Sequence, residues 1–326
     1  MQRRNVLAAT SLIALAALGL TACNSGEPGE APRGDEITQV RVAALPIANL
    51  APLYIAIEKG YFLEEGIEVV TEGTQGGAAA IPAMVAGDID ITYTDNVPII
   101  TAVSKGLPLV EIGQLTQIRE DDQAVGVFVR GDSPIQTMAD LAGGTLAVNS
   151  LGNITHLRVL VDLTAEGLSV DDVQFVEMPL TEIASGLTTG RVDAGFIVEP
   201  FTTMVKAQGA RQISDAANAT TAGIPADGLA ATRKYVEENP ETIAGFVRAL
   251  KRGMSDAAAD PENARAVLSN YTSLTPEQIA SVGLPNYMDP SKTSSEEIRE
   301  RLQVLAGLMV EFGLIDTEFD IAGIFE

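Results

Sequence analysis

The sequence predicts an α/β protein with two mostly parallel sheets, each flanked by helices, followed by a helical C-terminal region. Short apolar runs alternate with helical patterns across residues 40–112, and a second round covers residues 124–198. From residue 240 onward the pattern is helical only. The short connections between strands and helices favour parallel sheets that are covered on both faces.

The first round begins with an apolar run over residues 40–45, which is typical of a buried strand and which Pro46 ends. Apolar residues at helical spacing predict a helix over residues 52–59, ended by Gly60. The same reasoning predicts strands at 67–70, 89–93 and 109–112 and helices at 78–86 and 97–105.

The second round begins with the apolar extended run 124–129, which we expect to cross into a second lobe. It continues with predicted strands at 146–149, 173–176 and 194–198 and predicted helices at 157–166 and 182–189. An apolar stretch at 229–231 is the expected return strand.

The C-terminal third is expected to be helical and to pack back onto the first lobe. Pro240 suits a first helical turn, because its missing N–H would have no partner there. Ser294 precedes two acidic residues in the manner of a helix cap. The predicted helices are 240–259, 261–270, 276–282 and 295–312.

Composition excludes several classes of function. The 326-residue chain has a net charge of −23, which argues against a nucleic-acid partner. One Cys and one His exclude a disulfide framework and Cys-rich or His-clustered metal sites. We therefore expect no metal and no cofactor. The one His, His156, begins a predicted helix, where a capping or surface role is the expected one.

The N-terminus has the layout of an export signal. Arg3 and Arg4 precede an uncharged apolar run of 15 residues, which is too short to span a bilayer as a helix. Residues 20–23 (Leu-Thr-Ala-Cys) resemble the lipobox of bacterial lipoproteins. The resemblance implies a signal peptide over residues 1–22, lipidation of Cys23 and an extracytoplasmic protein anchored to the bacterial cell membrane.

Two alternatives stay open at this end of the chain. One is a secreted protein cleaved elsewhere, and the other is export by the twin-arginine route. Residues 23–37 are rich in Gly, Pro and acid and are predicted to be a flexible tether. Removal of residues 1–22 changes the net charge from −23 to −25.

Four segments in order resemble the solute-binding proteins of ABC importers of the nitrate, sulfonate and taurine group and their thiamine-precursor relatives. The first segment runs from an Ala-Pro-Leu-Tyr start to a Glu-Gly-Ile-Glu-Val end, and the last contains Gly-Arg-Val-Asp-Ala and Glu-Pro. The four are residues 51–69, 84–91, 133–148 and 190–201, within a resemblance over 38–313.

This resemblance implies a two-lobed periplasmic-binding-protein-like fold of type II, which closes on a ligand. Lobe one is expected over residues 38–123 with 221–326, and lobe two over residues 124–220. Ligands of open α/β sheets bind at the carboxyl ends of the strands, so the loops after the strands are the expected site.

Three loops of lobe one supply candidate ligand-binding residues. Asn49 follows the first strand, and it could instead cap the next helix. The Gly76-Gly77-Ala78 loop opens a helix whose N-terminus favours ligand oxygens, although a tight turn explains the glycines equally. Asp95 and Asn96 follow the third strand, where Asp95 is an acceptor for a ligand N–H or a helix cap.

Lobe two supplies the remaining candidates. Ser150, Gly152 and Asn153 form the loop after a predicted strand and before a helix, the counterpart of the Gly76 loop. Glu199 follows the last strand of lobe two, and a structural role at a helix start is the alternative.

The leading hypothesis is a binding protein that delivers a small molecule to a membrane permease of an ABC importer, as a monomer. An enzyme on the same scaffold is the second class, as in some pyrimidine-synthesis relatives, but the chain lacks the common catalytic motifs. An adhesion or sensory lipoprotein is the third.

The predicted ligand is a small organic molecule that carries hydrogen-bond donors, such as a pyrimidine-type vitamin precursor. Asp95 and Glu199 would repel an anion if they face the cleft, and the candidate loops contain no Arg or Lys. Arg119 is the nearest basic residue in sequence. The alternative is a small oxyanion or sulfonate, such as nitrate, taurine or an alkanesulfonate.

Overall fold

The computed structural model describes residues 37–74, 76–122 and 124–325, which belong to one compact unit beginning at Ile37. The predicted signal peptide, the lipidation site Cys23 and the tether up to Glu36 lie outside the described residues.

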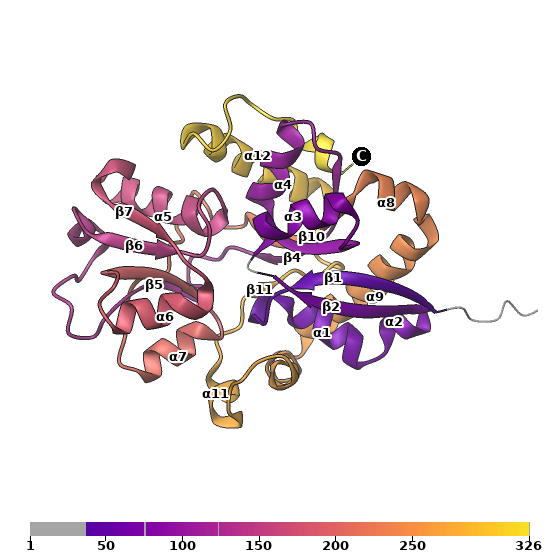
Figure 1. Ribbon diagram of the computed structural model, residues 1–326, viewed down its shortest axis with the longest axis horizontal. Coiled ribbons are helices and arrows are strands. Elements are labelled where there is room, and N and C mark those ends of the chain that lie inside the picture. Colours follow the sequence, from indigo (N-terminus) through magenta and orange to yellow (C-terminus); the bar gives the residue numbers. More distant parts are fainter. Residues whose placement is uncertain (1–36, 75, 123, 326) are drawn as a thin grey trace, which may run out of the picture. The chain divides into compact units, whose positions relative to one another are not determined.

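One six-stranded sheet, sheet A, contains the strands of the first round together with two later ones. Its strand order is β11-β4-β10-β3-β1-β2 (Figure 1). The strands are β1 (Thr38–Ala44), β2 (Ile67–Gly73), β3 (Ile91–Asp95), β4 (Leu109–Gln117), β10 (Pro225–Thr232) and β11 (Asn286–Tyr287).

Sheet A is mixed, which corrects the expectation of a mostly parallel sheet. β1 pairs in parallel with β2 and β3, but β10 lies between β3 and β4 and runs antiparallel to both. The physical reason is the return of the chain from the second sheet. β10 re-enters from the side where β3 ends, so it can complete the ladder only in the opposite direction.

A five-stranded sheet, sheet B, has the order β7-β6-β8-β5-β9. β6 is parallel to β7 and β8, whereas β5 is antiparallel to β8 and β9. The run 124–129 is therefore an interior strand of this sheet. The strands are β5 (Val125–Val129), β6 (Thr145–Val148), β7 (Gln174–Glu177), β8 (Ala194–Val198) and β9 (Arg211–Ser214).

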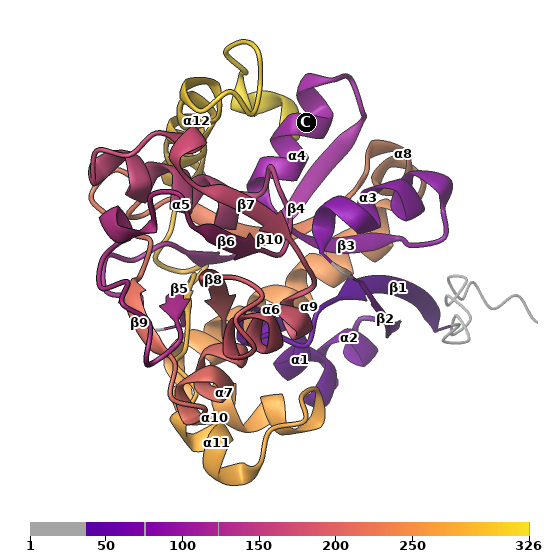
Figure 2. The same cartoon turned by 60° about the vertical axis from the view of Figure 1, so that its left-hand side comes forward.

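Helices lie on both faces of each sheet, as the alternation of strands and helices predicts (Figures 1 and 2). Sheet A is flanked by α1 (Ala51–Glu58), α2 (Tyr61–Glu64), α3 (Gly77–Ala86) and α4 (Asn96–Ser104). Sheet B is flanked by α5 (Ile154–Ala165), α6 (Leu180–Thr188) and α7 (Phe201–Ala207). Over the described ranges, no helix has the length and apolar character needed to cross a bilayer.

The C-terminal helices pack on sheet A and its helices, as expected. α9 contacts α1, α2 and β4, and α12 contacts α4 and β10. Phe246 of α9 lies against Phe62 of α2, with ring centroids 4.8 Å apart and both side chains fully buried. These helices are α8 (Arg233–Glu238), α9 (Pro240–Ala259), α10 (Pro261–Ala266), α11 (Pro276–Ser281) and α12 (Ser295–Glu311).

Gly253 lets α9 approach α1 closely. A Cβ atom at this position would lie 2.1 Å from the carbonyl oxygen of Pro52 and 3.0 Å from the Cβ of Ala56. The first contact is with backbone, which cannot rotate away, so the two helices would have to separate.

We predict that Gly253→Ala lowers the free energy of unfolding by about 1–3 kcal/mol through overpacking. The matched control is Gly307→Ala on the exposed face of α12, where a Cβ would contact nothing. That change removes a helical glycine and should stabilise the protein by up to about 1 kcal/mol. Urea unfolding measures both, and equal effects would show that the α1–α9 contact is not tight.

Candidate functional site

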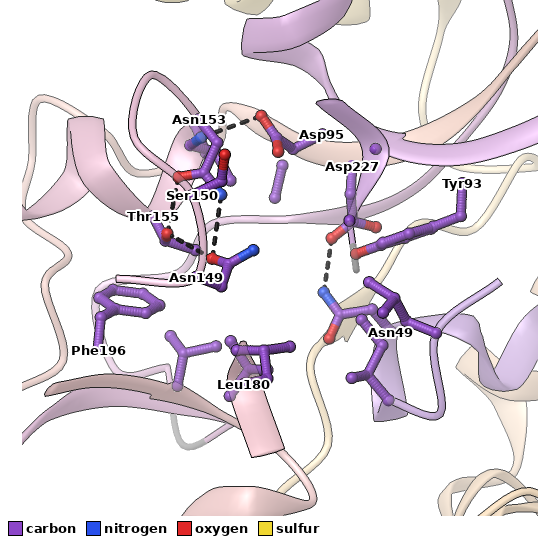
Figure 3. Close-up of a pocket in the computed structure, with 18 of the residues that line it drawn as sticks. Asn49, Tyr93, Asp95, Asn149, Ser150, Asn153, Thr155, Leu180, Phe196 and Asp227 are labelled. Carbon is purple, nitrogen blue, oxygen red and sulfur yellow. Dashed lines mark hydrogen bonds between the residues drawn. The ribbon is translucent and has the colours of Figure 1, made fainter. Parts of the chain in front are cut away.

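A cavity of about 340 Å³ lies at the carboxyl ends of strands from both sheets (Figure 3). Sheet A contributes the residues that follow β1 and β2 and the end of β3, and sheet B contributes the ends of β6, β7 and β8. β10 enters the cavity at its beginning, because it runs antiparallel to its neighbours. The cavity is where the rule for ligand sites in open α/β sheets places it.

Two carboxyl groups come from paired positions of neighbouring strands in the wall of this cavity that sheet A forms. Asp95 at the end of β3 is directly paired with Asp227 at the start of β10. Two like charges at directly opposite positions of neighbouring strands destabilise a sheet. Such a pair therefore calls for a functional explanation. Both carboxyl groups line the cavity.

Asp227 is almost fully buried, and only one of its oxygens is bonded. Its Oδ2 accepts from Asn49 Nδ2 at 2.5 Å and from Thr116 Oγ1 at 2.8 Å. Its Oδ1 and the Oδ1 of Asn49 are buried without a hydrogen-bond partner among the described residues. Because buried acceptors are normally paired, these two atoms mark Asp227 and Asn49 as candidate contacts for donors of a bound molecule.

Asp95 connects the N-termini of two helices. Its Oδ1 accepts from Val97 N at 3.1 Å, which caps α4, and from Ile154 N at 3.0 Å, at the first residue of α5. Helix N-termini carry unpaired amides and a partial positive charge, so one carboxylate satisfies a donor of each. Asp95 therefore both caps a helix and lines the cavity.

Burial governs the ionisation of both carboxyl groups. It raises the pKa of Asp95 to about 7, against the opposing effect of the Ile154 and Val97 amides. It raises the pKa of Asp227 to about 6, against the hydrogen bonds from Asn49 and Thr116 and the lowering effect of the Tyr93 hydroxyl. Both carboxyl groups therefore change their charge near neutral pH. A bound hydrogen-bond donor or cation would favour the ionised form of each.

The Gly76-Gly77 turn brings α3 against the end of β3. Gly76 has a φ of 148°, which other residues rarely adopt. A Cβ on Gly77 would lie 1.9 Å from Thr94 Oγ1, so the position admits only glycine. Both residues line the cavity, as does Ala79, and Ala78 lies between Gly77 and Ala79 within α3.

The loop after β6 forms the opposite side of the cavity. Asn149 Oδ1 accepts from Asn153 Nδ2 and from Thr155 Oγ1, at 3.0 and 2.9 Å. Asn153 Oδ1 caps α5 by accepting from His156 N at 3.0 Å. Ser150 is half-buried and also lines the cavity. This network fixes the loop, and the structure brings Asn149, Ser150 and Asn153 together there, as Figure 3 shows.

Arg158 is a basic residue in the lining, and its guanidinium group is already bonded to other parts of the protein. Its guanidinium donates to the carbonyl oxygens of Ala216 and Asp215 and lies 3.6 Å from the carboxylate of Asp122. It also lies over the Phe196 ring, 5.5 Å from its centroid. Burial and these partners leave the Arg158 guanidinium engaged by the protein itself.

Three predicted residues do not line the cavity. Asn96 is fully buried behind it and pairs with Gln114. Gly152 lies in a turn with a φ of 68°, and its amide donates to His156 Nδ1. Glu199 is buried elsewhere, where its carboxylate accepts from Thr203 and from the amide of Gly283. Each has a complete structural role at its position.

Two further residues that the sequence singled out have structural environments. The ring of His156 packs edge-on against Phe175 with centroids 4.6 Å apart, and burial lowers its pKa. Arg119 forms an exposed ion pair with Asp121. Among the described residues, no group of three or more His, Cys, Asp and Glu side chains is placed to hold a metal ion.

Sequence reasoning missed several lining residues, of which Asp227, Tyr93, Asn149, Arg158 and Phe196 are the most prominent. Asn149 ends a predicted strand and could have been found by the same rule as Ser150. Asp227 sits beside an expected strand, but its partner Asn49 is 178 positions away, and no local signal joins them.

Comparison with known proteins supports this picture of the fold. Residues 47–264 match the family described as NMT1/THI5 like. The riboflavin-binding protein RibY of Chloroflexus aurantiacus is 28% identical over 244 residues, which are 73% of this chain and 66% of that protein. The formylaminopyrimidine-binding protein of Halalkalibacterium halodurans is 28% identical over 260 residues, 78% of this chain and 76% of that protein.

The solved structures include the alkanesulfonate-binding protein SsuA from Xanthomonas axonopodis pv. citri bound to MOPS. It superimposes with a TM-score of 0.76 and 18% identity over 89% of this chain and 99% of that protein. This similarity confirms the fold class predicted from the sequence.

We predict that Asp227→Asn stabilises the unliganded protein at neutral pH. The folded-state pKa of about 6 exceeds the ordinary value, so the folded protein loses stability as the carboxyl ionises between about pH 4 and pH 6. Asparagine avoids this loss, and its gain over the wild type should rise across that window to about 1–3 kcal/mol and then stay constant.

The measurement is urea unfolding of both proteins across this pH range. Asp316→Asn, which removes an exposed carboxylate, is the control for net charge. A gain that does not change with pH, or a loss at pH 8, would contradict the burial of an ionised Asp227.

Proposed function

The chain belongs to the NMT1/THI5-like family, and from this premise we propose that it is the solute-binding component of an ABC importer. In this role it captures a small molecule in the cavity between its two sheets and presents it to a membrane permease. The observation that supports the proposal best is the cavity itself, since strand ends of both sheets meet there.

The ligand we propose is a small organic molecule rich in hydrogen-bond donors, with a pyrimidine-type vitamin precursor as the model compound. The orphaned Oδ1 atoms of Asp227 and Asn49 need donors, and Asp95 adds a third acceptor beside them. The apolar side chains of Leu180 and Phe196 in the same lining suit a flat ring. The formylaminopyrimidine-binding relative binds a ligand of this kind.

The alternative ligand is a sulfonate or another small oxyanion. In its favour, the cavity includes Arg158 and the N-terminal turn of α3, and helix N-termini bind anions. Against it, Arg158 is already engaged by Asp122 and two carbonyl groups, and two carboxylates would face the anion. The balance of charge favours the donor-bearing ligand.

The relatives named above are binding proteins by name rather than enzymes. Catalysis would require a nucleophile or an acid–base pair aimed at the ligand. His156 is held by Gly152 and Phe175 outside the cavity lining, which supports the assignment of a binding protein.

The two sheets with their helices act as lobes in this proposal, with boundaries at residues 123/124 and 220/221. Lipidation of Cys23 tethers the protein to the outer face of the cell membrane, and it works there as a monomer. The sequence supports this arrangement through the lipobox and the charge of −25 after signal removal, which keeps the body soluble.

A thermal-shift screen tests the function and the ligand class together. We expect a 4-aminopyrimidine with a hydroxymethyl group to stabilise the protein by about 2.7 kcal/mol at 100 times its Kd, and we expect taurine and ethanesulfonate to give no shift. Shifts with the sulfonates alone would contradict the donor-rich ligand and leave the binding function standing. Turnover of any shifted compound would contradict the binding-protein assignment.

Asp95→Ala should weaken ligand binding about tenfold or more, because it removes an acceptor from the cavity and the connection between α4 and α5. Its cost in unfolding free energy should be about 1 kcal/mol, the usual value of a lost helix cap. Ser294→Ala, which removes the cap of α12, is the matched control. Calorimetry should find the wild-type affinity in the Ser294→Ala control. If Asp95→Ala binds the ligand as tightly as this control does, Asp95 serves only as a helix cap.

A further inference from the structure

A second cavity, of about 290 Å³, lies beside β4, between residues of α9 and of α12. It shares no lining residue with the cavity described above. Its floor is a four-residue segment of β4, and its walls come from α9, from the segment after β11 and from α12. The proposed import function does not use it.

The walls are apolar. Leu250 and Met254 of α9 and Met288 after β11 are buried, and Ile298 of α12 and Phe325 are partly exposed. Methionine side chains adapt their shape to what they contact, so such a wall accepts an apolar body without demanding one exact outline.

The floor carries a buried carboxyl group. Glu111 is 9% exposed, and its Oε1 has no hydrogen-bond partner within the described part of the chain. The pairing of β4 with β10 is irregular here. Adjacent residues of β10, Leu229 and Ala230, pair with Gly113 and Glu111, so β4 has one extra residue between them. Such bulges re-aim side chains and are common beside functional sites.

Glu111 is held in place rather than left loose. The amide of Gly113 and the side chain of Gln114 favour the ionised form of its carboxyl group, and Gln114 is in turn paired with Asn96. Burial outweighs these effects and raises the pKa of Glu111 to about 8, which favours its neutral acid form. A buried carboxyl group with one unpaired oxygen is costly unless a partner satisfies it.

The mouth of the cavity is cationic. Lys251 and Arg299 are both exposed at its rim, and neither forms an ion pair with any described residue. Arg299 lies over Phe325, 5.1 Å from the ring centroid. Two positive charges at the entrance disfavour an ammonium ligand in a pocket whose floor is neutral.

We infer that this cavity is a second ligand site, for a small uncharged molecule with an apolar body and one carboxamide-like head. The body lies between α9 and Met288, and the head bonds the carboxyl group of Glu111. The carboxyl group donates when it is protonated and accepts when it is ionised, and an amide can complement either state.

Methionine-methyl NMR on the mature chain tests this directly, with hexanamide as the probe. The methyl signals of Met254 and Met288 should shift in a saturable way, while those of Met84 and Met178, which do not line this cavity, stay fixed. Shifts that do not saturate, or no shifts at millimolar hexanamide, would overturn the inference and assign the cavity to solvent only.

Three variants identify the role of the carboxyl. Glu111→Gln keeps a donor and an acceptor and should bind hexanamide within about threefold of the wild type, whereas Glu111→Leu should bind at least about tenfold more weakly. Glu68→Leu, at an exposed position of β2, should bind as the wild type does. Equal binding by Glu111→Leu and the wild type would contradict the assigned head-group contact.

Discussion

Two carboxylates on neighbouring strands determine the chemistry of the cavity. Asp95 and Asp227 are directly paired across β3 and β10, in a wall that also buries Asn49. Their oxygens outnumber the donors that the protein offers them, because Asp227 Oδ1 and Asn49 Oδ1 have no partner in the described chain. Keeping such groups costs stability, and under the proposed function a molecule with matching donors offsets part of that cost when it binds.

One of these two residues, Asp95, connects the cavity to helices of both sheets. Asp95 accepts from the first turn of α4 on the side of sheet A and from α5 on the side of sheet B. A ligand that changes the charge or position of Asp95 therefore acts on both helices at once. Its neighbour Asn96 pairs with Gln114, which itself lines the floor of the second cavity, so a buried polar pair lies between Asp95 and that floor.

The sequence predicted the strand and helix order because buried strands and amphipathic helices each leave a local pattern. It also placed Asn49, Gly76, Gly77, Asp95, Ser150 and Asn153 in loops that the fold brings to one cavity. It could not distinguish mixed from parallel sheets, since the direction of β10 depends on where the chain returns. It also missed Asp227 and Arg158, because their partners are distant in sequence and a buried charge has no local signature. Glu199 follows β8, as predicted, but it does not line this cavity, and its carboxylate accepts hydrogen bonds from Thr203 and Gly283.

The most direct test of this account is a crystal structure of the protein with its bound solute. The account predicts an N–H or O–H donor of the solute within about 2.7–3.2 Å of Asp227 Oδ1. A solute that instead places an anionic oxygen against Arg158, with Asp227 Oδ1 still unpartnered, would contradict it.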